Sequence, residues 1–215
     1  MVSFITFEGG DGTGKSTQIR LLERYLVAQG KTCLTTREPG GTSLGQLLRQ
    51  ILLESGNRPI SSSTELFLYL ADRAQHVHEV IAPAIRQGKI VLSDRHTDST
   101  VAYQGYGRGF DLQLLLSLNE IASGGLTPDI TFLLDCPVEL GLSRTVRRRS
   151  DTLKLKSDDR FESENLEFHE KVRQGFLDLA RAEPERFYII DASHPEQQVF
   201  AAVKEIVDRR LEFLS

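Results

Sequence analysis

Short runs of apolar and β-branched residues recur along the chain, separated by longer stretches in which apolar residues return every third or fourth position. The short runs have the length of buried strands and occupy residues 2–7, 31–36, 90–93, 130–134 and 187–190. The longer stretches have the period of amphipathic helices and occupy residues 18–29, 44–53, 64–88, 112–122, 138–146, 168–179 and 199–214. Strands that alternate with helices form a parallel sheet covered on both faces. The pattern therefore predicts an α/β fold with a five-stranded parallel sheet flanked by helices.

Glycine and proline mark the ends of these elements. Gly30 and Gly88 are expected to close helices, and Pro83 is expected to kink or break the helix that contains it. Residues 37–41 form a loop, because their Pro-Gly-Gly ending propagates neither helix nor strand. Residues 152–159 show no periodicity and are typical of a mobile surface loop. Since no linker interrupts the pattern, we expect a single domain over residues 1–215.

A glycine-rich segment follows the first expected strand. Its residues Gly9, Gly14, Lys15 and Ser16 match the phosphate-loop pattern G-x-x-x-x-G-K-[ST]. Glycines allow backbone N–H groups to point at phosphate oxygens, and the helix that follows adds the positive end of its dipole. The lysine reaches the β- and γ-phosphates, and the serine hydroxyl can ligate Mg²⁺. The segment therefore predicts a nucleoside triphosphate site made by residues Gly10, Asp11, Gly12, Thr13, Gly14, Lys15, Ser16 and Thr17.

Composition narrows the class of protein. The formal net charge of −4 argues against a general nucleic-acid binder, and no apolar run reaches the length of a membrane span. No signal peptide is recognisable at the start, so a cytoplasmic enzyme is expected. Cys33 and Cys136 lie far apart and are expected to be buried reduced thiols. His76 and His78 make no metal pattern and are expected on the surface of a helix.

Phosphate loops occur in kinases, GTPases and ATPases, so the residues of the other loops are needed to distinguish these classes of protein. The guanine-specifying Asn-Lys-x-Asp segment is absent from the sequence, and so is the extra lysine of partitioning ATPases. Charged residues instead gather at the expected carboxyl ends of strands, at Asp11, residues 37–38, residues 94–95 and Asp135. Arginines at such positions suit an enzyme that must neutralise two phosphorylated ligands and align them. The pattern favours a nucleotide kinase.

Four segments together resemble the bacterial thymidylate kinase family. They are the phosphate loop, residues 36–41 (Thr-Arg-Glu-Pro-Gly-Gly), residues 94–105 (Asp-Arg-His-x-x-Ser-Thr-x-Ala-Tyr-Gln-Gly), and residues 159–162 (Asp-Arg-Phe-Glu) with 168–173 (Phe-His-Glu-Lys-Val-Arg). The resemblance runs over nearly the whole chain in consistent order. It implies the three-layer fold of phosphate-loop nucleoside monophosphate kinases and transfer of a phosphoryl group from ATP, with Mg²⁺, to dTMP. It also implies a homodimer.

The resemblance assigns roles around the phosphates. Asp11 is expected to contact the 3′-hydroxyl of the thymidylate sugar near Mg²⁺, and Arg95 to grip the acceptor phosphate. Arg37 and Arg49 are further candidates for that phosphate, and Glu38 is placed near the metal and the acceptor. The expected metal ligands are Ser16, Asp11 and Glu38. The alternatives are a turn-forming Asp11, an Arg95–Asp94 salt bridge, an exposed Arg49 and a Glu38 that only stabilises its loop.

Further positions of the resemblance concern the base and the sugar. Tyr69 stands where the family usually has a phenylalanine that stacks on thymine, with Phe67 as the alternative. Arg73 lies one helical turn later and is expected to donate to a base carbonyl. Thr100 and Gln104 are expected to meet the rest of the thymine edge. Tyr103 is expected to pack against the sugar and to exclude a 2′-hydroxyl.

The lid is expected at about residues 144–162. Some family members carry a catalytic arginine inside the phosphate loop, where this chain has Gly12, and others carry it in a lid. The positive charge must then come from the arginines of this segment, which are Arg144, Arg147, Arg148, Arg149 and Arg160. Arg144 and Arg148 are expected to contact ATP, with Arg148 as the catalytic candidate; the alternative is a solvated charged face. Two other functions stay open, a kinase for another nucleoside or nucleotide and a nucleotide-dependent regulatory switch.

Overall fold

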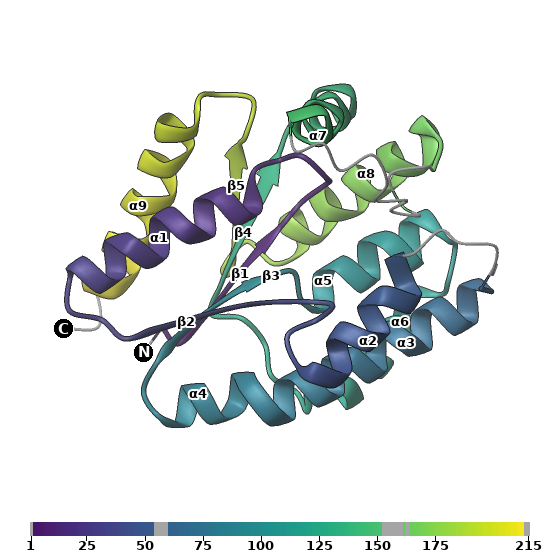
Figure 1. Ribbon diagram of the computed structural model, residues 1–215, viewed down its shortest axis with the longest axis horizontal. Coiled ribbons are helices and arrows are strands. Elements are labelled where there is room, and N and C mark those ends of the chain that lie inside the picture. Colours follow the sequence, from purple (N-terminus) through teal and green to yellow (C-terminus); the bar gives the residue numbers. More distant parts are fainter. Residues whose placement is uncertain (1, 54–59, 152–160, 162–163, 213–215) are drawn as a thin grey trace.

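The computed structural model describes residues 2–53, 60–151, 161 and 164–212, with only the backbone described at 148–151 and 212 (Figure 1). Its strands form a single five-stranded parallel sheet in the order β2-β3-β1-β4-β5. The strands are β1 (Phe4–Glu8), β2 (Cys33–Arg37), β3 (Ile90–Asp94), β4 (Ile130–Asp135) and β5 (Phe187–Asp191). The expected parallel sheet is confirmed. Each expected strand forms, with small shifts at its ends.

Helices connect the strands and cover the sheet. The α-helices are α1 (Lys15–Ala28), α2 (Ser43–Leu53), α3 (Ser62–His76), α4 (Ala82–Arg86), α5 (Thr97–Thr100), α6 (Leu112–Ser123), α7 (Val138–Asp151), α8 (Leu166–Ala182) and α9 (Glu196–Glu212). Two π-helical segments, η1 (Val77–Ile81) and η2 (Val101–Gly107), continue α3 and α5. The expected break at Pro83 takes the form of the wide turn η1, after which the helix continues as α4. Helices α5 and η2 were not expected from the pattern, because polar and aromatic residues interrupt its apolar period.

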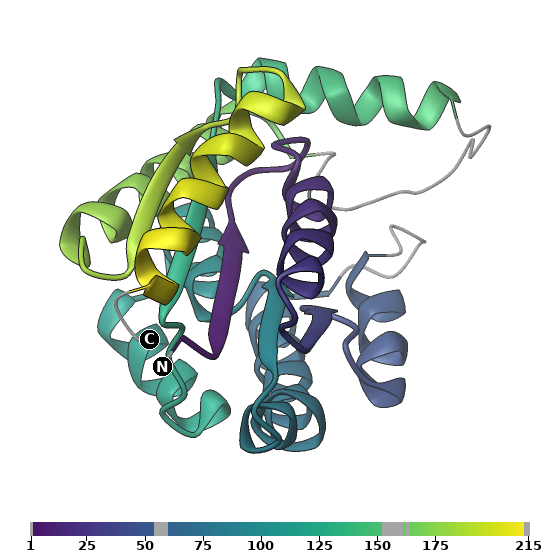
Figure 2. The same cartoon turned by 90° about the vertical axis from the view of Figure 1, so that its left-hand side faces the viewer.

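The side chains of each strand alternate between two layers of core. Ile5 and Phe7 of β1 point to the side covered by α1 and α9 and pack with Leu22 and Val203 there. Phe4, the residue before Ile5, points to the other side and packs with Ile81 of η1. Figures 1 and 2 show α1 and α9 together on one face and α3, α6 and α8 on the other. The sheet is therefore the middle of three layers.

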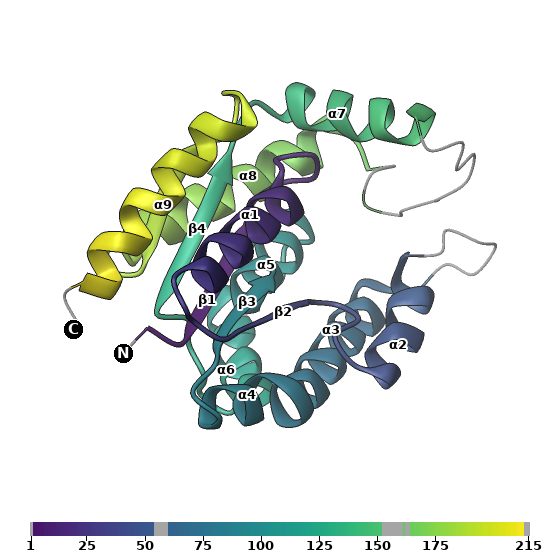
Figure 3. The same cartoon turned by 60° about the vertical axis from the view of Figure 1, so that its left-hand side comes forward.

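The carboxyl ends of the strands carry the loops that matter for function. The loop after β1 leads into α1, the loop after β2 leads into α2, and the turn after β3 leads into α5. Helix α7 leaves the carboxyl end of β4 and extends above the sheet (Figure 3). In parallel α/β sheets ligands bind at this edge. Within the described residues no helix is both long and apolar enough to cross a membrane.

Two expectations about single side chains were wrong. His76 is fully buried rather than on a helix surface, because its ring lies against Thr36 and Glu38. His78, two residues later, is exposed as expected. Cys136 is buried, but Cys33 is only half-buried, since it lies on the edge strand β2.

Candidate active site

The phosphate loop between β1 and α1 depends on its glycines. Gly9, Gly12 and Gly14 have φ angles of 129°, 74° and 95°, which side chains rarely tolerate. A Cβ on Gly9 would lie 2.3 Å from the carbonyl oxygen of Leu134, and one on Gly12 would lie 2.0 Å from that of Gly141. The loop is therefore seated against β4 and α7 by backbone contact. Gly14 is the N-cap of α1, whose N-terminus faces the loop.

Lys15 folds back over this loop. Its Nζ donates to the carbonyl oxygens of Gly9 and Gly10, at 3.1 and 2.7 Å, and the side chain is nearly buried. Burial and the nearby Arg95 guanidinium lower its pKa to about 8, although Asp94 acts in the opposite direction. The ammonium group is thus held at the mouth of the loop, where a phosphate oxygen can replace the carbonyls.

Ser16 identifies a residue that the sequence assignment missed. Its Oγ donates to Asp94 Oδ2 at 2.7 Å, from the first turn of α1 to the carboxyl end of β3. A hydroxyl and a carboxylate in this arrangement are the protein oxygens that hold Mg²⁺ in phosphate-loop enzymes. The sequence does contain a signal for this residue, because Asp94 is the last residue of β3, the strand that neighbours β1. Asp94 therefore joins Ser16 as a metal-ligand candidate.

Arg95 occupies a tight turn at the end of β3. Among the described residues, Arg95 is the one residue other than glycine that has a positive φ angle, 75°. Its backbone N–H donates to the Phe7 carbonyl. Its Nη1 donates to the Gly9 carbonyl and to Ser99 Oγ, and its Nη2 donates to Asp11 Oδ1 and Tyr103 Oη. Burial would raise the pKa of Asp11, but Arg95 and Lys15 hold it below its usual range. The guanidinium therefore stays charged between the phosphate loop and η2.

Glu8 holds this turn from beneath. Its carboxylate accepts from the backbone N–H of His96 and from Ser99 Oγ, and Ser99 in turn accepts from Arg95. Burial, together with the nearby Asp98 carboxylate, raises the pKa of Glu8 to about 8. The final residue of β1 thus orients Arg95 through one shared hydroxyl.

A cavity opens beside Arg95, and we call it the acceptor cavity. Its lining comprises Asp11, Glu38, Pro39, Arg49, Leu53, Tyr69, Arg73, Arg95, His96, Ser99, Thr100, Tyr103, Gln104 and Phe161. The residues assigned to the base and the sugar, Tyr69, Arg73, Thr100, Tyr103 and Gln104, are thus brought together here, although they come from α3, α5 and η2. Tyr69 lines the cavity, whereas Phe67 is 61% exposed and does not, and stacking of Tyr69 on the base stays a prediction.

Arg73 forms the floor of the acceptor cavity. Although only 2% exposed, it donates to Glu38 Oε2, Thr100 Oγ1, Asn119 Oδ1 and the His96 carbonyl. Each of these acceptors lies between 2.7 and 2.9 Å from its donor. The buried guanidinium is therefore fixed in one orientation, with its charge balanced by Glu38.

Glu38 lies beside Arg73, with both carboxylate oxygens bonded to protein groups. Oε2 accepts from Arg73, and Oε1 contacts the Nδ1 atoms of His76 and His96 at 3.0 Å each. Burial alone would raise the pKa of Glu38, but Arg73 and His96 hold it well below its usual range. These contacts match the loop-stabilising alternative, and a place for Glu38 in the metal shell stays a prediction.

Aromatic rings form one wall of the acceptor cavity. Phe161 lies 6.2 Å from the Tyr69 ring and 5.3 Å from the Tyr103 ring, measured between centroids, and is itself buried. Arg108 stacks over Phe161 at 5.4 Å. Phe161 belongs to the segment expected to form the lid, and sequence reasoning gave it no role. Its place in a wall with two tyrosines depends on residues far away in the sequence, so the local pattern does not predict it.

A second, more polar cavity lies over the phosphate loop, and we call it the phosphate cradle. It is lined by Asp11, Gly12, Gly14, Lys15, Ser16, Thr17, Arg37, Glu38, Arg49, Asp94 and Arg95. The two arginines assigned to the acceptor phosphate, Arg37 and Arg49, both reach it, and Arg49 Nη1 also donates to the Pro39 carbonyl. Thr13 is buried and donates to the Gly10 carbonyl, so it holds the loop together from within.

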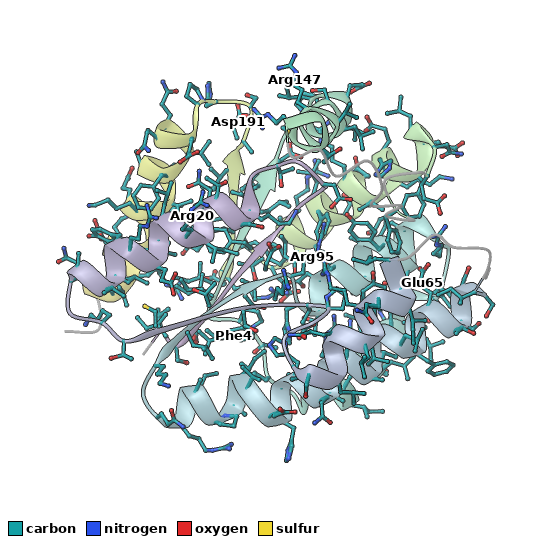
Figure 4. All side chains as sticks on the ribbon, in the orientation of Figure 1. Phe4, Arg20, Glu65, Arg95, Arg147 and Asp191 are labelled. Carbon is teal, nitrogen blue, oxygen red and sulfur yellow. The ribbon has the colours of Figure 1, made fainter. Side chains whose placement is uncertain are left out.

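The arginines of the expected lid are only partly described. Arg144 Nη1 and Nη2 donate to the carbonyl oxygens of Ala192 and Ser193, in the loop that follows β5. Arg147 is exposed and projects outward from α7 (Figure 4). The side chains of Arg148 and Arg149, and all of Arg160, lie outside the described residues. Their roles stay predictions.

Comparison with known proteins agrees with this geometry. The family model described as thymidylate kinase matches residues 7–203. Thymidylate kinase from Desulfovibrio desulfuricans is 53% identical over 97% of this chain and 96% of its own length. Thymidylate kinase from Geotalea uraniireducens is 51% identical over 98% of this chain and 99% of its own length. The crystal structure of thymidylate kinase from Ehrlichia chaffeensis matches with a TM-score of 0.76 and 35% identity, covering 96% of this chain and 98% of that one. The chain belongs to the thymidylate kinase family.

Proposed function

We propose that this chain transfers the γ-phosphoryl group of ATP to dTMP and releases ADP and dTDP. The observation that carries the proposal is that the phosphate cradle and the acceptor cavity share Asp11, Glu38, Arg49 and Arg95 in their linings. Ligands held in the two cavities meet at these side chains, as in-line transfer requires. Membership of the thymidylate kinase family supports dTMP as the acceptor.

The proposed reaction needs no covalent intermediate. An oxygen of the dTMP phosphate attacks the γ-phosphorus, and the bond between that phosphorus and the β–γ bridging oxygen breaks. A phosphate monoester is already anionic near neutral pH, so no general base is required. Arg95, held by Gly9, Ser99, Asp11 and Tyr103, lies where it can hold the acceptor phosphate and balance the charge that spreads during transfer.

Mg²⁺ fits the polar end of the phosphate cradle. Ser16 and Asp94 would hold it, with Asp11 and Glu38 as the further predicted ligands, because hard oxygens are the ligands that Mg²⁺ prefers. When bound, the ion neutralises charge on the β- and γ-phosphates. No group of three or more His, Cys, Asp or Glu side chains among the described residues is arranged to hold a metal alone. This suits an ion that takes its other ligands from phosphate and water.

The proposal includes a lid at about residues 144–162 on the single domain 1–215. Arg144 and Arg148 of α7 would contact ATP, with Arg148 adding positive charge at the transferring phosphate. The support is the start of α7, which touches the phosphate loop at Gly12 and Gly141. A lid that closes over both ligands excludes water and so prevents hydrolysis of ATP.

We also propose a homodimer that acts in the cytoplasm. Helix α3 contacts both α2 and α6, and the three helices carry large apolar side chains that are about half or more exposed. These side chains are Leu44, Leu47, Ile51, Phe67, Leu114, Leu116 and Ile121. Patches of this kind are typical of protein interfaces. Phe67→Asp is expected to shift the sedimentation coefficient from that of a dimer to that of a monomer, and Val27→Asp, an exposed change on α1, is not.

The decisive experiment is a panel of nucleoside monophosphates with ATP and Mg²⁺, in which product diphosphates are separated and counted. We expect kcat/KM for dTMP to exceed that for dCMP, dGMP and dAMP by at least about 100-fold. A preference for dCMP or dGMP would reassign the chain to another nucleotide. Slow ATP hydrolysis that no acceptor stimulates would instead identify a nucleotide-dependent switch.

A further inference from the structure

Glu65, labelled in Figure 4, is a fully buried carboxylate on α3 and is not part of the lining of the acceptor cavity. Gln104 Nε2 donates to its Oε1 at 3.0 Å. Arg108 donates to both of its oxygens, from Nε at 3.3 Å and from Nη2 at 3.2 Å. A buried charge is costly unless it is paired, and Arg108 supplies the pairing. The contact with Gln104 adds no charge to this pairing, because the amide is neutral.

The contact determines which way the Gln104 amide faces. A carboxylate only accepts hydrogen bonds, so the end of the amide that meets Glu65 must be the NH₂ group. The carbonyl Oε1 is then the end left for the acceptor cavity, which Gln104 lines. Within the described residues this Oε1 has no hydrogen-bond donor. Glu65 thus makes Gln104 present an acceptor to whatever base occupies the cavity.

Arg73 presents the opposite polarity in the same cavity. Of its five N–H groups, four donate to Glu38, Thr100, Asn119 and the His96 carbonyl. The fifth, on Nη2, has no acceptor among the described residues, and Arg73 lines the cavity. The lining therefore offers one fixed donor and one fixed acceptor.

We propose that Glu65 is a specificity-determining residue, because by orienting the Gln104 amide it makes the acceptor cavity select thymine or uracil against cytosine. Thymine and uracil carry an N3–H donor beside an O4 acceptor, which complement Gln104 Oε1 and the Arg73 N–H. Cytosine carries an N3 acceptor beside an N4 amino donor, so both of its groups would meet like groups. Glu65 acts through Gln104 and is a positioning residue. The inference rests on the proposed function and assigns the origin of its base selectivity.

The test is the full-length Glu65→Gln variant, assayed with ATP, Mg²⁺ and each of dTMP, dUMP and dCMP. A glutamine at 65 can accept or donate, so it no longer fixes the Gln104 amide, which can rotate and present NH₂ to the base. We expect kcat/KM for dTMP and dUMP to fall together by about 10- to 100-fold, mainly through KM. The value for dCMP should not fall. The dTMP/dCMP ratio is the readout, since general damage to the site lowers all three values alike.

Glu164→Gln is the matched control. Glu164 Oε1 is a second carboxylate partner of Arg108, at 2.6 Å, and the variant leaves Glu65 and Gln104 unchanged. It removes the same charge from the same arginine, so the dTMP/dCMP ratio should equal that of the wild type. A ratio that falls equally in both variants would attribute the effect to Arg108 and overturn the proposal.

Exchanging the two residues gives an independent test. In the double variant Glu65→Gln with Gln104→Glu, the amide at 65 donates to one oxygen of the carboxylate at 104, and the other oxygen faces the base as an acceptor. Selectivity for dTMP over dCMP should return. The double variant keeps a carboxylate near Arg108, so it can be tested even if Glu65→Gln alone fails to fold. A folded double variant without selectivity for dTMP would contradict the proposal.

A wild type that prefers dCMP would refute the proposed function itself, whereas an unchanged dTMP/dCMP ratio in folded Glu65→Gln would refute only the role of Glu65.

Discussion

The acceptor cavity and the phosphate cradle lie side by side but are held together differently. In the acceptor cavity the polar side chains are bonded to buried partners that a ligand does not replace, as Arg73 is to Glu38 and Asn119. In the phosphate cradle Lys15 is bonded to carbonyls of its own loop and Ser16 to Asp94. The acceptor cavity is therefore organised before its ligand binds. In the phosphate cradle, Lys15 and Ser16 would exchange these protein contacts for contacts with phosphate and metal.

This difference matters because the two sites solve different problems. A base is recognised by a few neutral groups, and a donor or acceptor that is free to rotate loses selectivity, so its support must be rigid. A triphosphate brings several negative charges, which can displace the weaker contacts of Lys15 with carbonyl oxygens. Arg95 belongs to both linings and connects the rigid site with the exchanging one.

Removing Arg95 should have the largest effect, because Arg95 lines both cavities and donates to the phosphate loop as well as to Tyr103. We expect Arg95→Ala to lower kcat by about 10³- to 10⁵-fold, the range for an arginine that stabilises phosphoryl transfer. Steady-state kinetics with ATP and dTMP would measure it. Arg181→Ala, which removes an arginine whose side chain is 65% exposed on α8, is the control and should leave kcat unchanged. Near-normal turnover in Arg95→Ala would contradict the proposed transfer geometry.

Asn119→Ala tests the rigid site alone. Asn119 is buried outside the acceptor cavity, accepts from Arg73 and donates to the Thr97 carbonyl, so its loss leaves the guanidinium less constrained. We expect KM for dTMP to rise about tenfold, KM for ATP to stay the same, and the free energy of unfolding to fall by about 1–3 kcal/mol. Asn119→Asp keeps an acceptor for Arg73 and should recover most of the KM effect. Equal increases in both KM values would remove the distinction between the sites.

The pH dependence tests the exchanging site. Burial lowers the pKa of Lys15 to about 8, so the free enzyme loses the positive charge of Lys15 as the pH rises through 8. We expect kcat/KM for ATP to fall about tenfold for each further pH unit. Glu8, whose pKa is also about 8, is the competing group. A fall that disappears in Glu8→Gln would assign the titration to Glu8 instead.

The same pKa predicts a change in stability. Between pH 8 and the ordinary lysine pKa of 10.5, Lys15 is protonated in the unfolded chain and neutral in the folded one, so the free energy of unfolding should rise with pH over this window.

The smallest expected effect concerns the Tyr103 hydroxyl, one of four acceptors around Arg95. Tyr103→Phe removes this acceptor and keeps the ring, so we expect kcat to fall only about two- to fivefold. Its preference for dTMP over the ribonucleotide should not change, whereas Tyr103→Ala should weaken that preference. Competition between the two acceptors in one assay would measure it, and an unchanged preference in Tyr103→Ala would count against packing on the sugar.

Local signals were enough to predict the sheet and the loop. The strand–glycine–helix order around residues 4–28 and the apolar runs of β1, β3 and β4 fix a parallel sheet whatever lies elsewhere in the chain. Charged residues at the ends of β1, β2 and β3 then meet, because parallel strands place their carboxyl ends at one edge. The resemblance to a family added the base-facing residues of α3 and η2, which periodicity alone does not mark.

The supports of the site could not be predicted in this way, because each depends on partners far away in the sequence. His76 has the position of a surface residue on α3 until Glu38, 38 residues earlier, is placed beside it. Glu65 and Asn119 are polar residues on amphipathic helices, and such residues are usually solvated. Their burial follows from contacts with Gln104 and Arg73 across 39 and 46 residues. Sequence reasoning finds groups that face a ligand more easily than the groups that hold them.

The close approach of Gly12 to Gly141 restricts which residue the phosphate loop can carry at residue 12. An arginine at residue 12 would bring its Cβ to 2.0 Å from the Gly141 carbonyl oxygen, and a side chain at 141 would bring its Cβ to 2.5 Å from that of Asp11. With the two backbones in this register, the loop has no room for a side chain of its own at residue 12. Placing an arginine at residue 12 would require the first turn of α7 to withdraw, so we expect such a substitution only together with a compensating change where α7 begins.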